Sequence, residues 1–393
     1  MSVSKKIHTM MTTSSWIRRM FEEGAKLKSI HGAANVFDFS LGNPNLQPPP
    51  EFKKILKETA LNDQAGTHAY MPNVGYPEVR QSIANYLKKE QGEDISGDQI
   101  VMTCGAAGAL NVIFKTLLDP MDEVLVPAPY FVEYGSYADN HGGVLKTVKT
   151  NADFTLNLDW MASAITAKTK IVLINSPNNP TGQIYSKESL IDLGKLLEQK
   201  SRSFGRAIYL VSDEPYRKII YDDAVVPGIF NCYQNAIVAT SYSKDISIPG
   251  ERIGFAAVHP GASAAADIMN GMALANRILG FVNAPAMMQK VIASVQGLRV
   301  DMSLYEKNRN LLYEALVSYG YEITKPMGAF YLFPRTPIED DVKFVNALQE
   351  ELILTVPGSG FGGPGHFRIA YCVETDTIER SLPGFKRVIE KFK

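Results

Sequence analysis

One lysine and one arginine near the middle of the chain have types and spacing that suit chemistry with an aldehyde. Lys244 follows the apolar run 237–240 within one turn, and Arg252 comes eight residues later. A lysine whose proton affinity is lowered by a neighbouring arginine can form a Schiff base with an aldehyde cofactor. Ser241, in the same turn, and Arg252 would also hold a phosphate group. The alternative is a lysine that simply ends a buried strand in solvent.

A carboxylate follows another apolar run in the same way. Asp213 lies just after the run 207–211. Beneath a pyridine ring, a carboxylate keeps the ring nitrogen protonated and makes the ring an electron sink. The same group could instead cap a following helix. Asp213 is therefore a candidate partner for a pyridine cofactor, and helix capping is the simpler alternative.

A short string of small residues lies between an expected strand and an expected helix. Residues 105–108 read Gly-Ala-Ala-Gly, so no side chain would obstruct an approaching anion. Backbone N–H groups and the helix dipole would then be free to bind phosphate. Close packing of the helix on the sheet is the alternative explanation for the same residues.

Residues 175–182 read Asn-Ser-Pro-Asn-Asn-Pro-Thr-Gly and carry a more specific signal. This segment resembles the N-P-T-G segment of the class I and II aminotransferases, which are pyridoxal-phosphate enzymes of fold type I. The S-D-E-P-Y turn at 212–216, the Ser-x-x-Lys string with its later arginine, and F-R-I-A at 367–370 match the same family in the same order. The resemblance runs from about residue 41 to the C-terminus.

The resemblance implies a role for each matching position. Lys244 resembles the lysine that holds pyridoxal phosphate as a Schiff base and then moves the substrate proton as general base and acid. Asp213 resembles the partner of the pyridine nitrogen, and Asn179 and Tyr216 resemble donors to the phenolic oxygen of the ring. Arg368 resembles the arginine that binds the α-carboxylate of the substrate.

The remaining matches complete the expected site. The resemblance implies a phosphate site and a stacked aromatic ring, made by Gly105, Ala106, Ala107, Ser241, Arg252 and Phe131. Tyr70 resembles a tyrosine that reaches the phosphate of the other subunit, which implies a homodimer with active sites at the subunit interface. Gly42 and Asn179 join Arg368 as expected substrate contacts. Because alanines replace the larger polar residues of many relatives, the phosphate should depend on backbone groups, Ser241 and Arg252.

The elements that must position these residues alternate along the chain. Short β-branched runs at 100–103, 123–127, 170–174, 207–211 and 237–240 are separated by helical patterns. This alternation predicts an α/β fold with a mostly parallel sheet covered by helices on both faces. Ligands of such sheets bind outside the carboxyl ends of the strands, where the candidate residues lie. The resemblance implies that the sheet has seven strands.

A second pattern predicts a smaller α+β unit. Helical segments dominate from about residue 285 to 319, and strands are expected at 328–334, 353–357 and 367–372. An amphipathic helix is expected in residues 16–30, where Trp16, Ile17, Met20, Phe21, Leu27 and Ile30 recur at helical spacing. We expect residues 1–45 and 290–393 to form this small domain and residues 46–289 to form the large cofactor-binding domain.

The composition excludes several classes of function. Forty basic and 41 acidic residues give a net charge of -1, without the basic surface that a nucleic-acid partner needs. No uninterrupted apolar run of membrane length and no secretory signal pattern occurs, so no membrane partner is expected. Three scattered cysteines and six histidines without ligand spacing argue against a disulfide framework or a metal site. A cytoplasmic protein is expected.

Transamination between an L-amino acid and a 2-oxo acid is the predicted activity, with aspartate and 2-oxoglutarate as the first expected pair. A C–S lyase that uses the same cofactor is the main alternative, since one cofactor site supports several reactions. A non-catalytic regulator that binds the cofactor is a further alternative. Lys115 and Arg277 are the unusually placed cations that could bind a distal carboxylate, or both could be structural.

Overall fold

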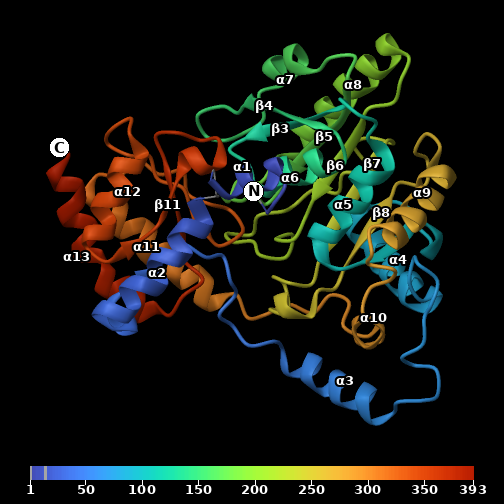
Figure 1. Ribbon diagram of the computed structural model, residues 1–393, viewed down its shortest axis with the longest axis horizontal. Coiled ribbons are helices and arrows are strands. Elements are labelled where there is room, and N and C mark those ends of the chain that lie inside the picture. The colour runs from blue at the N-terminus through green and yellow to red at the C-terminus, as the bar shows by residue number, and fades with distance from the viewer. Residues whose placement is uncertain (1, 13–15) are drawn as a thin grey trace.

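A seven-stranded sheet forms the centre of the protein in the computed structural model, which describes residues 2–12 and 16–393 (Figure 1). The strand order is β2-β8-β7-β6-β5-β3-β4; β8 runs antiparallel to both neighbours, and every other neighbouring pair is parallel. The strands are β2 (Ile100–Thr103), β3 (Glu123–Ala128), β4 (Val144–Lys149), β5 (Thr169–Asn175), β6 (Tyr209–Asp213), β7 (Ala236–Ser241) and β8 (Gly254–Val258). The predicted mostly parallel, seven-stranded sheet is confirmed.

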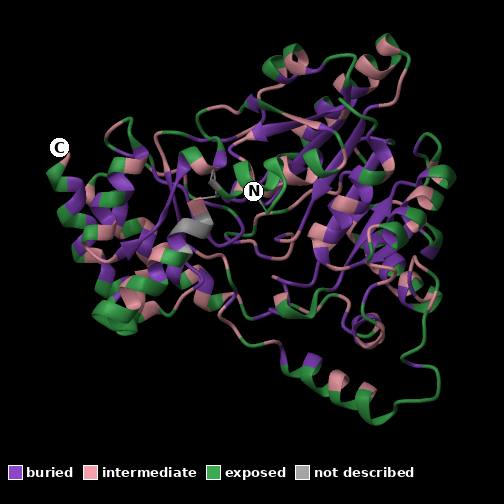
Figure 2. Ribbon diagram, in the orientation of Figure 1, coloured by how far each residue is buried: buried purple, intermediate pink, exposed green. Residues whose placement is uncertain are grey.

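Alternate residues of the central strands face two separate apolar cores, as the two-residue repeat of a strand requires. The strands of this sheet are largely buried (Figure 2). On β5, Ile171 and Leu173 belong to one core, and Val172 and Ile174 belong to the other. The first core includes residues of α5 (Gly105–Leu117), α6 (Glu133–Asn140) and α9 (Ala265–Ile278). The second includes residues of α3 (Pro50–Leu61), α4 (Pro77–Gln91), α7 (Leu158–Ala164), α8 (Lys187–Phe204) and α10 (Ala286–Ala293). Helices on both faces are therefore also confirmed.

A third apolar core lies beside the sheet and is built mainly from residues 300–389, drawn in orange to red (Figure 1). It contains a small antiparallel sheet in the order β11-β12-β9. Its elements are β9 (Tyr331–Leu332), β11 (Val356–Pro357), β12 (Phe367–Ala370), α11 (Ser303–Tyr319), α12 (Asp341–Glu350) and α13 (Thr375–Lys391). The domain boundaries at 45/46 and 289/290 stay a prediction. Tyr216 and Ile219, from the range expected for the large domain, also belong to this core.

The N-terminal segment contributes two helices and one short strand. The helices are α1 (Lys5–Thr12) and α2 (Trp16–His31), and β1 (Phe37–Asp38) pairs in parallel with β10 (Ile353–Leu354). The amphipathic helix expected at 16–30 corresponds to α2, and its Met20 is buried in the third core. The side chains of Ile17 and Phe21 lie outside the described residues. Single turns of 3-10 helix occur at Ala33–Asn35, Gly97–Gln99, Pro249–Glu251 and Gly358–Phe361.

The register of the large sheet brings distant strand ends together. Asn175 pairs with Asp213, and Asp213 pairs with Ala239 on the next strand. Gly254 begins β8 between Ser241 and Thr103, and a Cβ at this position would collide with backbone atoms of Thr240 and Gly105. The chain therefore approaches itself closely at this edge. No helix in the described part of the chain is both long and apolar enough to cross a membrane.

Candidate active site

A cavity of about 280 Å³ lies at the carboxyl edge of the large sheet and gathers most of the predicted residues. Its lining includes these predicted positions: Gly42, Ala106, Ala107, Phe131, Asn179, Asp213, Tyr216, Ser241, Lys244, Arg252 and Arg368. They come from seven separate segments of the chain, which the fold brings together. Gly105 is not part of the lining but lies close to it. A Cβ at Gly105 would be 2.9 Å from Nη2 of Arg252, which does line the cavity.

The Lys244 ammonium is partly buried and lacks a carboxylate partner among the described residues. Its Nζ donates to the carbonyl oxygen of Gly42 at 2.8 Å. The pKa of Lys244 is lowered to about 8, mainly by burial; Cys372 acts in the opposite direction, and Arg368 and Arg252 contribute smaller decreases. The sequence had suggested that Arg252 is the cause, but loss of hydration is the larger effect. A neutral amine is therefore accessible near neutral pH, as a nucleophile or a base requires.

The two oxygens of Asp213 have different surroundings. Oδ2 accepts a hydrogen bond from the hydroxyl of Tyr134 at 2.5 Å. Oδ1 is buried and has no hydrogen-bond partner among the described residues. The pKa of Asp213 is raised to about 7, mainly by burial; the hydrogen bond from Tyr134 opposes this rise, and the neighbouring Glu214 adds to it. A cationic N–H group in the cavity would give Oδ1 the partner that it lacks.

A helix terminus and an arginine form the anion-binding end of the cavity. Gly105 begins α5 with a φ of +74°, which favours glycine. The first N–H groups of α5, including those of Ala106 and Ala107, have no partner within the helix. The Arg252 guanidinium lies beside this terminus and donates to the carbonyl oxygen of Pro249 at 2.8 Å. Together with Ser241, these groups suit a phosphate.

The buried Arg368 guanidinium lines the same cavity and lies beside two aromatic rings. It lies 4.7 Å from the centre of the Tyr331 ring and 4.6 Å from that of Phe361. It donates to the backbone oxygen of Ser40 at 2.6 Å and to Oδ1 of Asn179 at 3.1 Å. Its Nε has no partner among the described residues. A buried guanidinium without a counter-charge suits the carboxylate of a ligand.

Asn179 and Tyr216 are held by side chains that the sequence did not single out. The Asn179 N–H donates to Oδ1 of Asn175 at 2.7 Å, and the Tyr216 hydroxyl bonds to that of Tyr331 at 2.8 Å. A Cβ at Gly42 would overlap the Tyr331 hydroxyl, so glycine is needed there. Asn175 begins the N-S-P-N-N-P-T-G string and so was within reach of sequence reasoning. Tyr134 and Tyr331 carried no motif signal.

Three residues to which the sequence analysis gave a possible role do not line this cavity: Tyr70, Lys115 and Arg277. Tyr70 is 89% exposed, so it has no role within the cavity of its own chain. Lys115 on α5 and Arg277 on α9 are both exposed and do not line the cavity. Glu251, which precedes Arg252, is also exposed. The roles suggested for Tyr70, Lys115 and Arg277 stay predictions.

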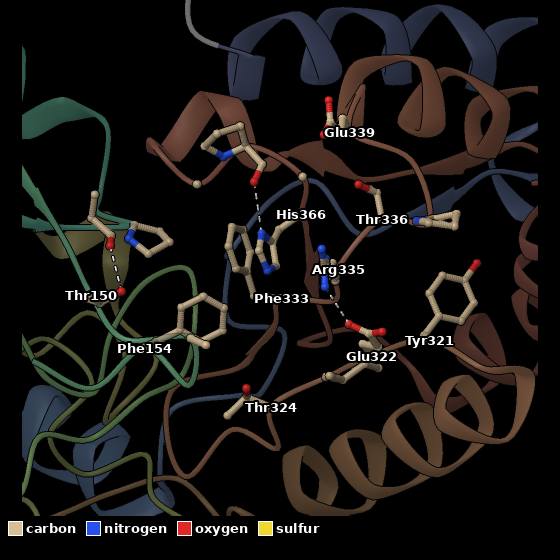
Figure 3. A pocket seen from close by; sticks show the side chains of 18 of the residues that line it. Thr150, Phe154, Tyr321, Glu322, Thr324, Phe333, Arg335, Thr336, Glu339 and His366 are labelled. Carbon is tan, nitrogen blue, oxygen red and sulfur yellow. Dashed lines mark hydrogen bonds and ion pairs between the residues drawn. The ribbon is translucent and has the colours of Figure 1, made fainter. Parts of the chain in front are cut away.

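A larger hollow of about 1340 Å³ lies between the loop after β4 and the third core. Figure 3 shows its lining, in which the His366 ring stacks on Phe333 at 5.1 Å and Phe154 lies nearby. Arg335 and Glu322, two exposed residues of its lining, form an ion pair at 3.1 Å. None of the residues predicted to bind cofactor or substrate lines it. The smaller cavity is therefore the candidate active site.

Comparison with known proteins gives one consistent family. Residues 34–383 match the model of the family described as aminotransferase class I and II. A probable aspartate aminotransferase of Methanocaldococcus jannaschii is 33% identical over 366 residues, covering 91% of this chain and 94% of the relative. The aspartate aminotransferase of Bacillus subtilis is 32% identical, covering 93% of this chain and 95% of its own.

A solved structure extends this similarity to the fold. An aminotransferase from Eubacterium rectale has a TM-score of 0.97 and 39% sequence identity, with complete coverage of both chains. The aspartate aminotransferase of Thermus thermophilus with maleate has a TM-score of 0.87 and 26% identity, covering 99% of this chain and 100% of its own. The predicted family and fold class are confirmed.

Proposed function

This chain belongs to the class I and II aminotransferase family, and from that premise we propose that it transfers amino groups with pyridoxal phosphate held covalently by Lys244. The main support for this proposal is Oδ1 of Asp213, which is buried without a hydrogen-bond partner among the described residues. Asp213 and Lys244 line the same cavity. A protonated pyridine nitrogen is the kind of group that Oδ1 lacks. When bound, the cofactor supplies an electron sink that makes the Cα–H bond of the substrate acidic.

The other residues of the cavity would hold the remaining parts of the cofactor. The backbone at 105–107, Ser241 and Arg252 would bind the phosphate, and the ring of Phe131 would pack on the pyridine face. Asn179 and Tyr216 would donate to the phenolic oxygen. These groups line one cavity, with the phosphate site at the N-terminus of α5, so the residues fit this cofactor.

The protein's own groups would orient the substrate and move its proton. Arg368 would bind the α-carboxylate through two parallel hydrogen bonds, which fixes the substrate in the cavity. Because burial lowers the pKa of Lys244 to about 8, its neutral amine would accept the Cα proton and return it as the product forms. Tyr216, bonded to Tyr331 at 2.8 Å, would keep its place beside the ring.

Reduction of the protein with borohydride, followed by digestion and mass analysis, tests the covalent assignment. The pyridoxyl group should be found on the peptide that contains Lys244. Modification of another lysine would contradict the assignment. The control is the Lys244→Ala variant, which should retain no pyridoxyl group after the same treatment.

We further propose that aspartate and 2-oxoglutarate are the substrates, because relatives covering over nine tenths of the chain are named aspartate aminotransferases. The test is a half-reaction panel that measures which amino acids convert the bound aldehyde to the amine. Aspartate should react with the highest second-order rate constant. Faster reaction with alanine or an aromatic amino acid would contradict this choice, and release of pyruvate and ammonia from cystathionine would favour the lyase.

A cytoplasmic homodimer is the proposed form of the enzyme. The resemblance of Tyr70 to a tyrosine that reaches the other subunit motivates it, and Tyr70 is 89% exposed, so its ring is accessible to a second chain. The free thiols of Cys104, Cys232 and Cys372 suit a reducing compartment. Sedimentation at assay concentration should show a dimer, and a fully active monomer would contradict the role of Tyr70.

A further inference from the structure

The contact between Tyr134 and Asp213 joins two buried side chains that are far apart in the sequence. Tyr134 is completely buried in the first turn of α6, and its hydroxyl donates to Oδ2 of Asp213 at 2.5 Å. Among the described residues, no other side chain forms a hydrogen bond with this carboxylate. The rotation of the Asp213 side chain is therefore limited by one hydroxyl group.

The position of Tyr134 is itself fixed. Its N–H donates to the carbonyl oxygen of Phe131 at 3.2 Å, and the two rings pack edge to face at 5.5 Å. Burial and the neighbouring carboxylate of Asp213 raise the pKa of Tyr134 well above that of a free tyrosine, so the hydroxyl keeps its proton and remains a donor. One turn of chain thus carries the ring expected on the cofactor face and the donor to Asp213.

We propose that Tyr134 is a positioning residue for the cofactor, because its hydroxyl holds Oδ2 of Asp213 and leaves Oδ1 for the ring nitrogen. This inference rests on the proposed function. The asymmetry of the carboxylate supports it: one oxygen has a short bond, and the other is buried and unpartnered. Without the hydroxyl, both oxygens would be buried and unpartnered, and the carboxyl group would take up a proton more readily.

The test compares two ligands of the protein freed of cofactor. Pyridoxal phosphate has the ring nitrogen, and its 1-deaza analogue has a C–H group in its place. Tyr134→Phe keeps the aromatic ring and removes only the hydroxyl. We expect this variant to bind pyridoxal phosphate about tenfold more weakly, the order expected for one hydrogen bond to a charged group. Its affinity for the deaza analogue should equal that of the unaltered protein.

A matched control removes another buried tyrosine hydroxyl from the strand that carries Asp213. Tyr209 lies at the opposite end of β6, and its hydroxyl donates to the backbone oxygen of Ser263 at 3.0 Å. Tyr209→Phe should change neither affinity. In an Asp213→Ala background, adding Tyr134→Phe should have no further effect on either ligand, since the two side chains act through one contact.

Three results would overturn the inference. Equal weakening of both ligands by Tyr134→Phe would show that the tyrosine only shapes the cavity. Unchanged binding of pyridoxal phosphate would show that the hydroxyl does not matter for the ring nitrogen. If the unaltered protein bound no pyridoxal phosphate at all, the proposed function would fail, and this inference would fail with it.

Discussion

Replacement of Arg368 by lysine should weaken every amino acid and every oxo acid by a similar factor. The guanidinium is 2% exposed, and its direction is set by Ser40, Asn179 and the rings of Tyr331 and Phe361. A lysine keeps the charge but offers no fixed plane for a carboxylate. Because all transaminase substrates share the α-carboxylate, the loss should not depend on the side chain of the substrate.

The structure gives the size of the effect. Arg368 has no carboxylate partner among the described residues, so a substrate can take both parallel hydrogen bonds. The Arg368→Lys variant loses one charge-assisted bond, worth about 1.5–3 kcal/mol. This corresponds to a half-saturating concentration about 10- to 150-fold higher. Turnover should also fall, because the same two bonds orient the Cα–H bond towards Lys244.

Steady-state kinetics with one acidic and one neutral amino acid, together with a cofactor titration, measure these changes. Cofactor affinity should stay unchanged, because the groups proposed to bind its phosphate are Ser241, Arg252 and the N-terminus of α5, and not Arg368. The matched control is Arg380→Lys on α13, an exposed arginine that pairs with Asp376 at 3.3 Å, and its kinetics should equal those of the unaltered protein. Weakening of the acidic substrate alone would refute the reasoning and make Arg368 a selector of side chains.

Three other substitutions test the charges around the cavity. Asp213→Asn should leave the cofactor bound but raise the activation free energy of the half-reaction by several kcal/mol, since asparagine cannot keep the ring nitrogen protonated; near-normal stopped-flow rates would contradict this. Without cofactor, the Lys244→Met variant should be more stable than the unaltered protein at pH 7, by at most roughly 3 kcal/mol. The reason is that folding lowers the pKa of Lys244 from 10.5 to about 8, so a charged Lys244 destabilises the folded state. The difference should shrink as the pH rises from 8 to 10.5, and urea unfolding that shows no such trend would disprove it. Lys218→Met should lower the free energy of unfolding by about 3–5 kcal/mol, since it leaves Asp245 buried without its ion pair at 3.0 Å. The exposed pair of Lys195 and Asp192 is the control, and Lys195→Met should change stability by less than about 1 kcal/mol.

Much of the fold and of the candidate site was predictable from the sequence. Five of the seven strands of the large sheet were placed, because buried parallel strands are short apolar runs between helical patterns. Two strands were missed: β4 (Val144–Lys149) is only partly buried, and β8 (Gly254–Val258) has glycine and alanine at three of its five positions. Neither gives a clear apolar run.

The sequence by itself determined the types and local spacing of the cofactor residues. Strand ends and local motifs identify Lys244, Asp213 and Asn179 as neighbours in one site, since the carboxyl ends of parallel strands meet at one edge of the sheet. These are short-range features, so a single chain read in order contains them.

Only the tertiary structure decided how these groups are partnered. Tyr134 reaches Asp213 across 79 positions and Tyr216 reaches Tyr331 across 115, with no motif to connect them. The tertiary structure also showed that burial, more than the neighbouring Arg252, lowers the pKa of Lys244. Hydration and hydrogen bonding depend on every atom packed around a group, and those atoms come from strands and helices far apart in the sequence.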